Sequence, residues 1–434
     1  MNTTGGSYFV QYVYSKSLGI NISKDIKELI NEGFEIKKEE LLPGDLVFTR
    51  IDHVGIYIGN NEIIHYSDGL IQINKITNFY KGRRIIERIN NNENTVNYIN
   101  NLSDVALGEI IFRSNTALHQ TDENWEFLLG DYNNNGILDL YCINKKNTQS
   151  NSEVYILDGS TNFKTFLLQT GTALHETGEN FQFLLGDYNH NGKLDLYCIK
   201  KCNTGTNSTE VHILNGNDNF QSYLLRTTTP LHETEDNFQF LLGDYNQNGK
   251  LDLYCIKKNH SESNKTEIHI LDGNDKYKSY LLKTSTKLHE TGEGWVFLLG
   301  DFNKNRILDL YCIAKYNTGS NSTEVHILNG NDNFKSFLHN NGTPLPEIGD
   351  NYDFQLEDYN NDGKLDLYCI KKFGTKSNCT EISIIRGNDN YQSVITSFPI
   401  KFPETDNDFS FFLFKDKLYI IKKGNNTEII CLKI

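Results

Sequence analysis

The chain has 434 residues, which is too many for one ordinary core, so two domains or one repeat array are expected. Its formal net charge of −14 argues against nucleic acid or an anionic membrane surface as partner and favours cations. No apolar run is long enough to span a bilayer, and the first residues do not have the pattern of a signal peptide. The chain is therefore either cytoplasmic or a mature or trimmed form.

The first part of the chain, residues 1–88, contains a pair of histidines on neighbouring strands. The stretch "LLPGDLVFTRIDHVGIYIGNNEIIHYS" at 41–67 has two apolar strands around a turn, followed by a Gly-Asn-Asn hairpin. His53 opens one strand and His65 ends the next, so the two imidazoles are expected side by side. Such a pair suits a thiol nucleophile, because one imidazole acts as base and a second polar group orients it.

This stretch resembles the NlpC-type peptidases of bacterial cell-wall peptides, which are papain-like cysteine hydrolases. The resemblance covers Pro43–Phe48, His53–Gly59 and Ile64–His65, and "FYKGRRI" at 79–85 fits the end of that domain. It implies a small, truncated α+β domain over 1–88 in which His53 matches the base and His65 the orienting residue.

The nucleophile of that family is missing here. In the family it lies in an Asp-Cys-Ser-Gly segment at the start of a helix, and "FVQYVYSKSLG" at 9–19 aligns with this helix without a gap. Gly6 stands at the cysteine, and the segment that normally precedes the helix is absent. Ser7 lies one residue beyond the cysteine position, and on a helix this rotates its side chain by about 100°. Its hydroxyl is also a weaker nucleophile than a thiolate. The domain is therefore expected not to cleave, whether Gly6 is natural, engineered or a sequence inaccuracy.

A repeat of about 57 residues follows an Asn-rich linker at 89–105. The repeats start at Thr116, Thr172, Thr229, Thr286, Thr343 and Ile400. Each complete unit has four candidate strands, such as "FQFLLGD", "KLDLYCIKK", "TEVHILNG" and "FQSYLLRT". The last unit has three, and "ALGEIIFRSNT" at 106–116 matches the missing fourth. These features predict a mainly β fold, with a six-bladed β-propeller over 106–434 closed by an N-terminal strand. An open solenoid is the alternative.

Five of the units carry Asp-x-Asn-x-Asn-Gly-x-x-Asp, or a close variant, between their first and second strands. Side chains at positions 1, 3, 5 and 9 and the carbonyl at position 7 can converge on one cation, and hard oxygen donors select calcium. A polar hairpin without metal is the alternative. The predicted ligands are Asp131, Asn133, Asn135, Ile137, Asp139, Asp187, Asn189, Asn191, Lys193, Asp195, Asp244, Asn246, Asn248, Lys250, Asp252, Asp301, Asn303, Asn305, Ile307, Asp309, Asp358, Asn360, Asp362, Lys364 and Asp366.

The five loops are not equivalent. The fifth has three carboxylates, Asp358, Asp362 and Asp366, and is expected to bind best. The fourth has Arg306 where the other loops have Gly and is expected to bind worst, and the sixth unit, with "FKDKLY", is expected to bind nothing. With mostly two carboxylates per loop, dissociation constants of about 10⁻⁴–10⁻³ M are expected.

These loops, with a strand before and "LDLYCI" after, resemble the FG-GAP or VCBS repeats of integrin α-subunit propellers. The resemblance implies that calcium stabilises the fold and that one face of the propeller binds partners. It does not indicate which partner is bound.

Sequons and cysteines also follow the repeat. Sequons at Asn207, Asn264, Asn321, Asn378 and Asn425 predict a secreted, glycosylated protein. Five cysteines recur at one strand position, too far apart to pair, and are interpreted as small buried hydrophobic residues. Cys202, Cys379 and Cys431 lie outside this pattern and no pairing is assigned to them. The histidines of "LHET", including His175, are interpreted as making local hydrogen bonds.

The sequence therefore predicts an extracellular calcium-binding propeller that acts in binding, adhesion or assembly and carries an inactive NlpC-like domain. Its expected partner is a glycan, a cell-wall or protein ligand, or a second copy of the chain. Two alternatives remain: a cell-wall peptide hydrolase that the propeller targets, and a structural subunit of an extracellular filament or surface layer.

Overall fold

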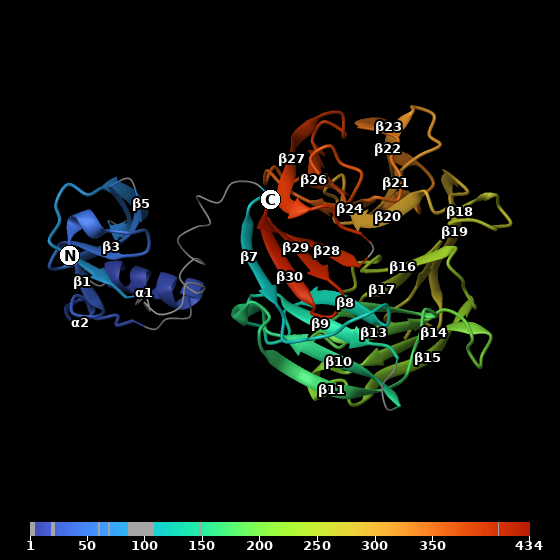
Figure 1. Ribbon diagram of the computed structural model, residues 1–434, viewed down its shortest axis with the longest axis horizontal. Coiled ribbons are helices and arrows are strands. Elements are labelled where there is room, and N and C mark those ends of the chain that lie inside the picture. The colour runs from blue at the N-terminus through green and yellow to red at the C-terminus, as the bar shows by residue number, and fades with distance from the viewer. Residues whose placement is uncertain are drawn as a thin grey trace. The chain divides into compact units, whose positions relative to one another are not determined.

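A computed structural model describes residues 5–18, 22–59, 61–67, 70–85, 108–146, 150–406 and 408–434. The chain divides into two compact units, Met1–Asp104 and Val105–Ile434 (Figure 1). The predicted linker at 89–105 lies outside the described residues.

The first unit is a six-stranded antiparallel sheet with two helices, α1 (Gly5–Leu18) and α2 (Ile26–Leu29). In sheet order the strands are β1 (Phe34–Ile36), β6 (Lys81–Arg84), β2 (Leu46–Arg50), β3 (His53–Gly59), β4 (Glu62–Ser67) and β5 (Leu70–Lys75). Helix α1 begins at Gly5, four residues before the stretch at 9–19 that aligns with the helix of the NlpC-type family.

Helix α1 packs on one face of this sheet. Val10 and Tyr14, one helical turn apart, are buried against Phe48, Val54 and Ile56. Side chains alternate between the two faces of a strand, so Val47 and Ile63 form a separate cluster with Ile76. Both faces of the sheet therefore carry apolar side chains, and the helix covers the face that Val54 occupies.

The second unit consists of six four-stranded antiparallel sheets. The first contains β8 (Trp125–Gly130), β9 (Asp139–Asn144), β10 (Asn151–Leu157) and β11 (Phe166–His175). The second contains β12 (Phe181–Gly186), β13 (Asp195–Lys200), β14 (Ser208–Leu214) and β15 (Tyr223–His232), and the third β16 (Phe238–Gly243), β17 (Asp252–Lys257), β18 (Lys265–Leu271) and β19 (Tyr280–His289). The fourth contains β20 (Trp295–Gly300), β21 (Asp309–Ala314), β22 (Ser322–Leu328) and β23 (Phe337–Pro346), and the fifth β24 (Tyr352–Glu357), β25 (Asp366–Lys371), β26 (Cys379–Ile385) and β27 (Val394–Pro403).

The sixth sheet is built from both ends of the unit. Strands β28 (Phe409–Phe414), β29 (Lys417–Lys422) and β30 (Glu428–Lys433) come from the C-terminal residues. The fourth strand is β7 (Ile110–Asn115), which pairs antiparallel with β30. The strand that precedes the repeats in the sequence thus completes the last sheet.

The sheets pack against one another in chain order. Each first strand from β8 to β24 contacts the first strand of the next sheet, and Figure 1 shows these strands near a common centre. The sixth sheet also packs on the first, because Tyr419 and Ile421 share a buried cluster with Phe127 and Leu140. The apolar contacts therefore run without interruption through all six sheets.

Side-chain amides join neighbouring sheets near this centre. Gln182 Nε2 donates to the Phe240 carbonyl at 3.0 Å, and Gln239 Nε2 donates to the Phe297 carbonyl at 2.8 Å. Each bond runs from the first strand of one sheet to the first strand of the next. Because such an edge strand has no backbone partner on that side, the glutamine amide satisfies a carbonyl that would otherwise lack a donor.

Fourth strands are longer than the sequence predicted. Strand β11 continues past Thr172 to His175, after register shifts against β10. The residues that open the second to sixth predicted repeats therefore belong to the preceding sheet, and His175, like His232 and His289, is an exposed strand end.

Candidate functional site

The two predicted catalytic histidines lie side by side on the first unit's sheet. His53 is the first residue of β3 and His65 lies in β4, and Gly55 pairs with His65 in the register of these strands. Nε2 of His53 is 3.0 Å from Nδ1 of His65. The sequence predicted neither of their further neighbours, Thr49 and Asn74.

These four side chains form one hydrogen-bonded chain. Thr49 Oγ1 is 2.9 Å from Nδ1 of His53, and Asn74 Nδ2 is 2.9 Å from Nε2 of His65. With the Asn74 amide in this orientation, the neutral His65 carries its proton on Nδ1 and donates it to His53, whose own proton then faces Thr49. Both ring nitrogens of each histidine are engaged.

Gly6 lies in the first turn of α1, next to the strands that carry these histidines. A Cβ added at Gly6 would lie 3.4 Å from the Val54 carbonyl oxygen and 3.8 Å from the Tyr66 carbonyl oxygen. Val54 directly follows His53, and Tyr66 directly follows His65. These are ordinary contact distances, so a Cβ fits at position 6.

Ser7 is arranged for packing rather than for attack. Its side chain is buried, at 1% exposure, and its hydroxyl donates to the Lys24 carbonyl oxygen at 2.7 Å. A hydroxyl has only one proton, so this bond uses the proton that a general base would have to remove. The first cysteine of the chain is Cys142, in the second unit, and it is fully buried.

The five predicted metal loops share one hydrogen-bond pattern. In the first, the Asp131 carboxylate accepts the N–H groups of Asn135 and Gly136 at 3.0 and 2.7 Å. Asn133 Oδ1 also accepts from Asn135 N–H, and Asn135 Oδ1 accepts from Ile137 N–H. The side-chain oxygens at positions 1, 3 and 5 therefore turn into the loop, where the same bonds recur in all five copies.

The aspartate at position 9 is buried and joins the loop to the sheet. Asp139 accepts from Tyr132 N–H and from Gly159 N–H, both at 2.9 Å. Its equivalents Asp195, Asp252, Asp309 and Asp366 make the same pair of bonds. Burial raises the pKa of Asp252 to about 6, and the carboxylates of Asp272 and Asp244 add to this rise against the backbone bonds that lower it.

The donor set of these loops fits calcium by its chemistry. Carboxylate and amide oxygens at positions 1, 3 and 5 face the same short backbone segment, and each oxygen retains a lone pair after accepting an N–H. Among the described residues, no group of three or more His, Cys, Asp or Glu side chains is gathered as a metal site. A cation here would therefore rely on the asparagine oxygens as well.

The fourth and sixth units differ from this pattern as their sequences indicate. Arg306 takes a φ of 70° where Gly136 has 83°, so the fourth loop keeps its shape with a side chain in the left-handed region. In the sixth unit, β28 and β29 are joined by the two residues Lys415 and Asp416, and the loop is missing.

The sequon asparagines are exposed in the turns between second and third strands, and four of the five have positive φ (Asn207, Asn264, Asn321 and Asn378). The threonine two residues later is fully buried: Thr209 Oγ1, for example, donates to the His232 carbonyl at 2.9 Å. Asparagine tolerates the left-handed conformation and threonine makes a buried bond, so the repeated pattern also has a structural role.

The cysteines of the repeat are buried in second strands, and all eight cysteines are unpaired. Burial raises the pKa of each of the five repeated thiols, so none of them is a reactive thiolate. Within the described parts of the chain, no helix has the length and apolar character needed to cross a membrane.

Both units match known families. Residues 3–89 match the NlpC/P60 family, and residues 131–198, 187–255 and 301–369 match the FG-GAP-like repeat. The chain is 45% identical over 64 residues to the "Probable endopeptidase NlpC homolog" of Haemophilus influenzae, which covers 14% of this chain and 35% of that protein. It is 40% identical over 76 residues to the "Gamma-DL-glutamyl hydrolase" of Bacillus subtilis, covering 17% of this chain and 18% of that protein.

A third relative, the "Probable endopeptidase NlpC" of Escherichia coli, is 35% identical over 92 residues, which is 18% of this chain and 60% of that protein. The chain thus spans less than two thirds of each of these relatives. An exo-beta-1,3-galactanase from Clostridium thermocellum has a TM-score of 0.34 and 10% identity, over 74% of this chain and 69% of that one. The chain carries an NlpC/P60 domain at its N-terminal end, followed by FG-GAP-like repeats.

Proposed function

We propose that this chain is an extracellular binding protein whose NlpC/P60 domain does not cleave. One observation carries the proposal: the His53–His65 pair is intact, yet position 6 of α1 is a glycine whose Cβ site contacts the residues that follow both histidines. Glycine has no group that can attack a carbonyl. The proposed activity is therefore recognition, through the repeats and through whatever the domain still binds.

The repeat unit is proposed to form a closed six-bladed β-propeller. Three features support this: six four-stranded sheets in chain order, the completion of the sixth sheet by β7, and the cluster that joins Tyr419 to Phe127. Closure by the first strand protects two strand edges that an open array would expose.

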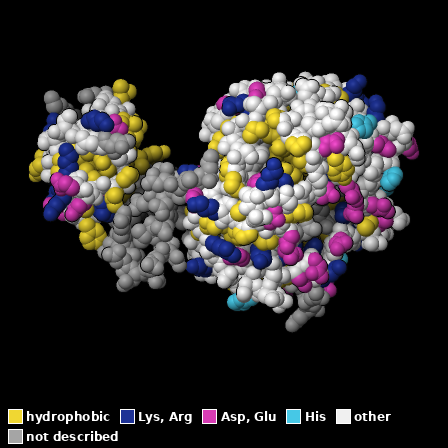
Figure 2. Space-filling model, turned by 45° about the horizontal axis from the view of Figure 1, so that its top comes forward, with side chains coloured by type: hydrophobic (Ala, Val, Ile, Leu, Met, Phe, Trp, Pro, Cys, Tyr) yellow, Lys and Arg dark blue, Asp and Glu magenta, His cyan; other side chains and the backbone are white. Residues whose placement is uncertain are grey.

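Calcium is proposed to bind at up to five of the loops that begin at Asp131, Asp187, Asp244, Asp301 and Asp358. The shared inward-turned oxygens and hard donor chemistry support it. Figure 2 shows many Asp and Glu side chains on the repeat unit, and an acidic surface of this kind favours cations over anionic partners. Secretion and glycosylation at the exposed sequon asparagines belong to the same proposal.

The test of the central claim is a hydrolysis assay with purified muropeptides, monitored by mass spectrometry. The wild-type chain is expected to release no product, while still binding cell-wall or glycan material in a pull-down. Turnover by the wild type that is lost in His53→Ala would overturn the proposal.

A second candidate, a hydrolase, is favoured by the contact between Thr49 and His53. If the Asn74 amide is turned by 180°, the chain of bonds reverses and the Thr49 hydroxyl donates to Nδ1 of His53, as a base-assisted nucleophile would. The relatives named as endopeptidases and hydrolases make this reaction class the one to test. Cleavage that Thr49→Val abolishes and that persists in Ser7→Ala would establish it.

A further inference from the structure

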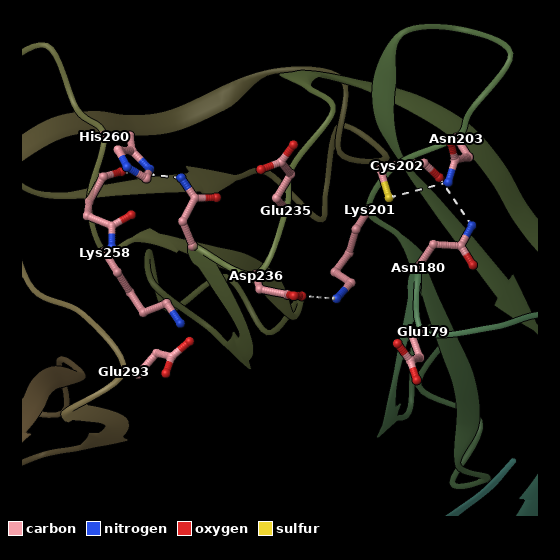
Figure 3. A pocket seen from close by; sticks show the side chains of 12 residues that line it. Glu179, Asn180, Lys201, Cys202, Asn203, Glu235, Asp236, Lys258, His260 and Glu293 are labelled. Carbon is pink, nitrogen blue, oxygen red and sulfur yellow. Dashed lines mark hydrogen bonds and ion pairs between the residues drawn. The ribbon is translucent and has the colours of Figure 1, made fainter. Parts of the chain in front are cut away.

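A pocket of about 530 Å³ lies between the second and third sheets of the repeat unit (Figure 3). It is lined by the residues that follow β13 and β17 and by those that precede β12, β16 and β20. Its volume is in the range of small-molecule sites. Neither the loops at the predicted metal positions nor the histidine pair contributes to it.

One position of the repeat carries no aromatic ring in the two consecutive units that line the pocket. A lysine directly follows each second strand, and the residue after that lysine is Lys146, Cys202, Asn259, Tyr316, Phe373 or Gly424 in the six units. Cys202 and Asn259 both line the pocket. In the fourth unit, by contrast, the Tyr316 ring covers Gly294, where a Cβ would lie 2.9 Å from the ring. The neighbouring pocket there is only about 300 Å³.

An ion pair forms part of the lining. Lys201 Nζ lies 3.2 Å from Asp236 Oδ1, across the junction between the two sheets. Burial lowers the pKa of Lys258, whereas the nearby Glu293 and Asp236 act to raise it. Figure 3 shows Lys201 directed at Asp236 and Lys258 near Glu293. The pocket's four carboxylates thus outnumber its two lysines, and Glu179 and Glu235 are the carboxylates that do not lie near a lysine in Figure 3.

Besides Cys202 and His260, the remaining lining residues are four asparagines. Asn180 Nδ2 donates to the Cys202 carbonyl at 3.2 Å, and Asn237 Nδ2 donates to the Asn259 carbonyl at 3.3 Å, which fixes both side chains. Asn259 Oδ1 is buried and has no donor among the described residues. The hydroxyl and acetamido groups of a ligand each offer a hydrogen-bond donor and an acceptor. They can therefore pair with fixed amides and carboxylates.

This composition excludes several ligand classes. The surplus of carboxylates repels phosphates, uronic acids and other anions. The lining contains no Phe, Tyr or Trp, and its one aromatic ring is the His260 imidazole, so a flat apolar ligand has little to stack on. What fits is a ligand without negative charge that is rich in hydroxyl and amide groups.

We propose that the pocket between the second and third sheets binds an uncharged oligosaccharide that carries N-acetylated sugar units. The inference rests on the proposed binding function and assigns it to one place and one ligand class. The ligand's hydroxyl groups donate to Glu179 and Glu235, and its acetamido groups pair with the asparagine amides.

The test uses the full chain and chitotetraose as probe, with binding followed by calorimetry and by ligand-observed NMR. The pocket is filled by the double variant Cys202→Phe/Asn259→Phe, which copies the natural combination of Asn351 and Phe373 in the fifth unit, where Asn351 Nδ2 donates to the Phe373 carbonyl. Saturable binding by the wild type and at least a tenfold loss in the double variant are expected.

Two further variants keep the result interpretable. Lys146→Phe places the same side chain at the same position of the first unit, outside the pocket lining, and should bind as the wild type does. Glu235→Gln alters one exposed pocket residue without filling it and should weaken binding several-fold; it decides the question if the double variant does not fold.

Three results would overturn the inference: no chitotetraose binding by the wild type, equal binding by the filled variant, or binding of tetralysine instead of the sugar. If the chain binds cell-wall material and the filled variant binds it equally well, the proposed binding function stands and this pocket is not its site. If no glycan or cell-wall material is bound at all, both fail.

Discussion

Nε2 of His53 lies 3.0 Å from Nδ1 of His65, so the pair that an NlpC/P60 domain would use as base and orienter is assembled in a chain that lacks the cysteine. Thr49 and Asn74 extend the pair into a chain of four side chains. Under the function proposed above, these side chains are the polar half of a hydrolytic site, and Gly6 stands where the site is interrupted.

Gly6→Cys should create hydrolysis of muropeptides where the wild type has none. The added Cβ meets the Val54 carbonyl oxygen at 3.4 Å, which is ordinary contact, so α1 should keep its place. A base-assisted thiol should raise the rate by roughly 10²-fold or more over background. Product formation is measured by mass spectrometry.

Gly6→Ala is the matched control, because it adds the Cβ without the thiol and should stay inactive. Adding Thr49→Val to Gly6→Cys should increase the rate, since the hydroxyl otherwise occupies Nδ1 of His53. A cysteine variant that folds, exposes a reactive thiol and still yields no product would contradict this account of the site.

Calcium removal should lower the melting temperature of the repeat unit. At a calcium concentration ten times the dissociation constant, each occupied site adds about 1.4 kcal/mol to the free energy of unfolding. Calorimetry with and without a chelator measures the shift. Asp358→Asn should reduce it more than Asp301→Asn does, because the fifth loop is the predicted strongest site. Identical melting curves with and without chelator would contradict the calcium proposal.

Arg306→Gly should stabilise the fourth loop even in the absence of metal. Arg306 has a φ of 70°, and a side chain in this region costs about 1–2 kcal/mol relative to glycine. Its N–H already donates to Asp301 at 2.7 Å, as Gly136 N–H does to Asp131, so the loop need not move. Chemical denaturation should show that the free energy of unfolding rises by about 1 kcal/mol. The reverse change, Gly136→Ala, should cost a similar amount.

Loss of either partner of the Asp45–Arg84 pair should destabilise the first unit. Arg84 Nε and Nη2 donate to the Asp45 carboxylate at 2.9 and 2.7 Å, and Asp45 is 4% exposed. Removing the arginine leaves a buried charge that, among the described residues, keeps the Leu42 N–H as its donor, at a cost of about 3 kcal/mol. Arg84→Met, which keeps the aliphatic length, is compared with Arg50→Met, whose guanidinium is largely exposed. Equal denaturation midpoints would contradict the prediction.

Some of this architecture follows from the sequence, because each repeat contains its own strands and turns. The positions of β12, β13 and β14 follow from apolar alternation and from the Asx-Gly turn alone. The contact of Thr49 with His53 does not, since it depends on a register shift between Phe48 and Arg50 that no local pattern specifies. The pocket was also missed, because it depends on the side-chain size of Cys202 and Asn259 across two different sheets.

The buried histidines of the third strands should make stability depend on pH. Burial lowers the pKa of His269 to about 4, against the opposing effect of Glu267, while Lys283 and Lys257 act in the same direction as burial. His212 and His326 are shifted in the same direction for the same reason. The unfolded chain, with a histidine pKa near 6.5, then binds more protons than the folded chain does between about pH 6.5 and 4. Stability is therefore complete above about pH 6.5 and falls as the pH drops toward 4.

His269→Tyr removes this titration with a side chain that the repeat already uses. In the first unit, Tyr155 occupies the equivalent position and its hydroxyl donates to Glu153 at 3.1 Å, as a tyrosine at 269 can to Glu267. Between pH 7 and pH 4.5, the free energy of unfolding should fall by about 1–3 kcal/mol less in the variant than in the wild type. Urea denaturation at both pH values measures this difference. His289→Tyr, at an exposed strand end, should leave the pH dependence as it is. If both variants follow the wild-type curve, acid sensitivity comes from other groups.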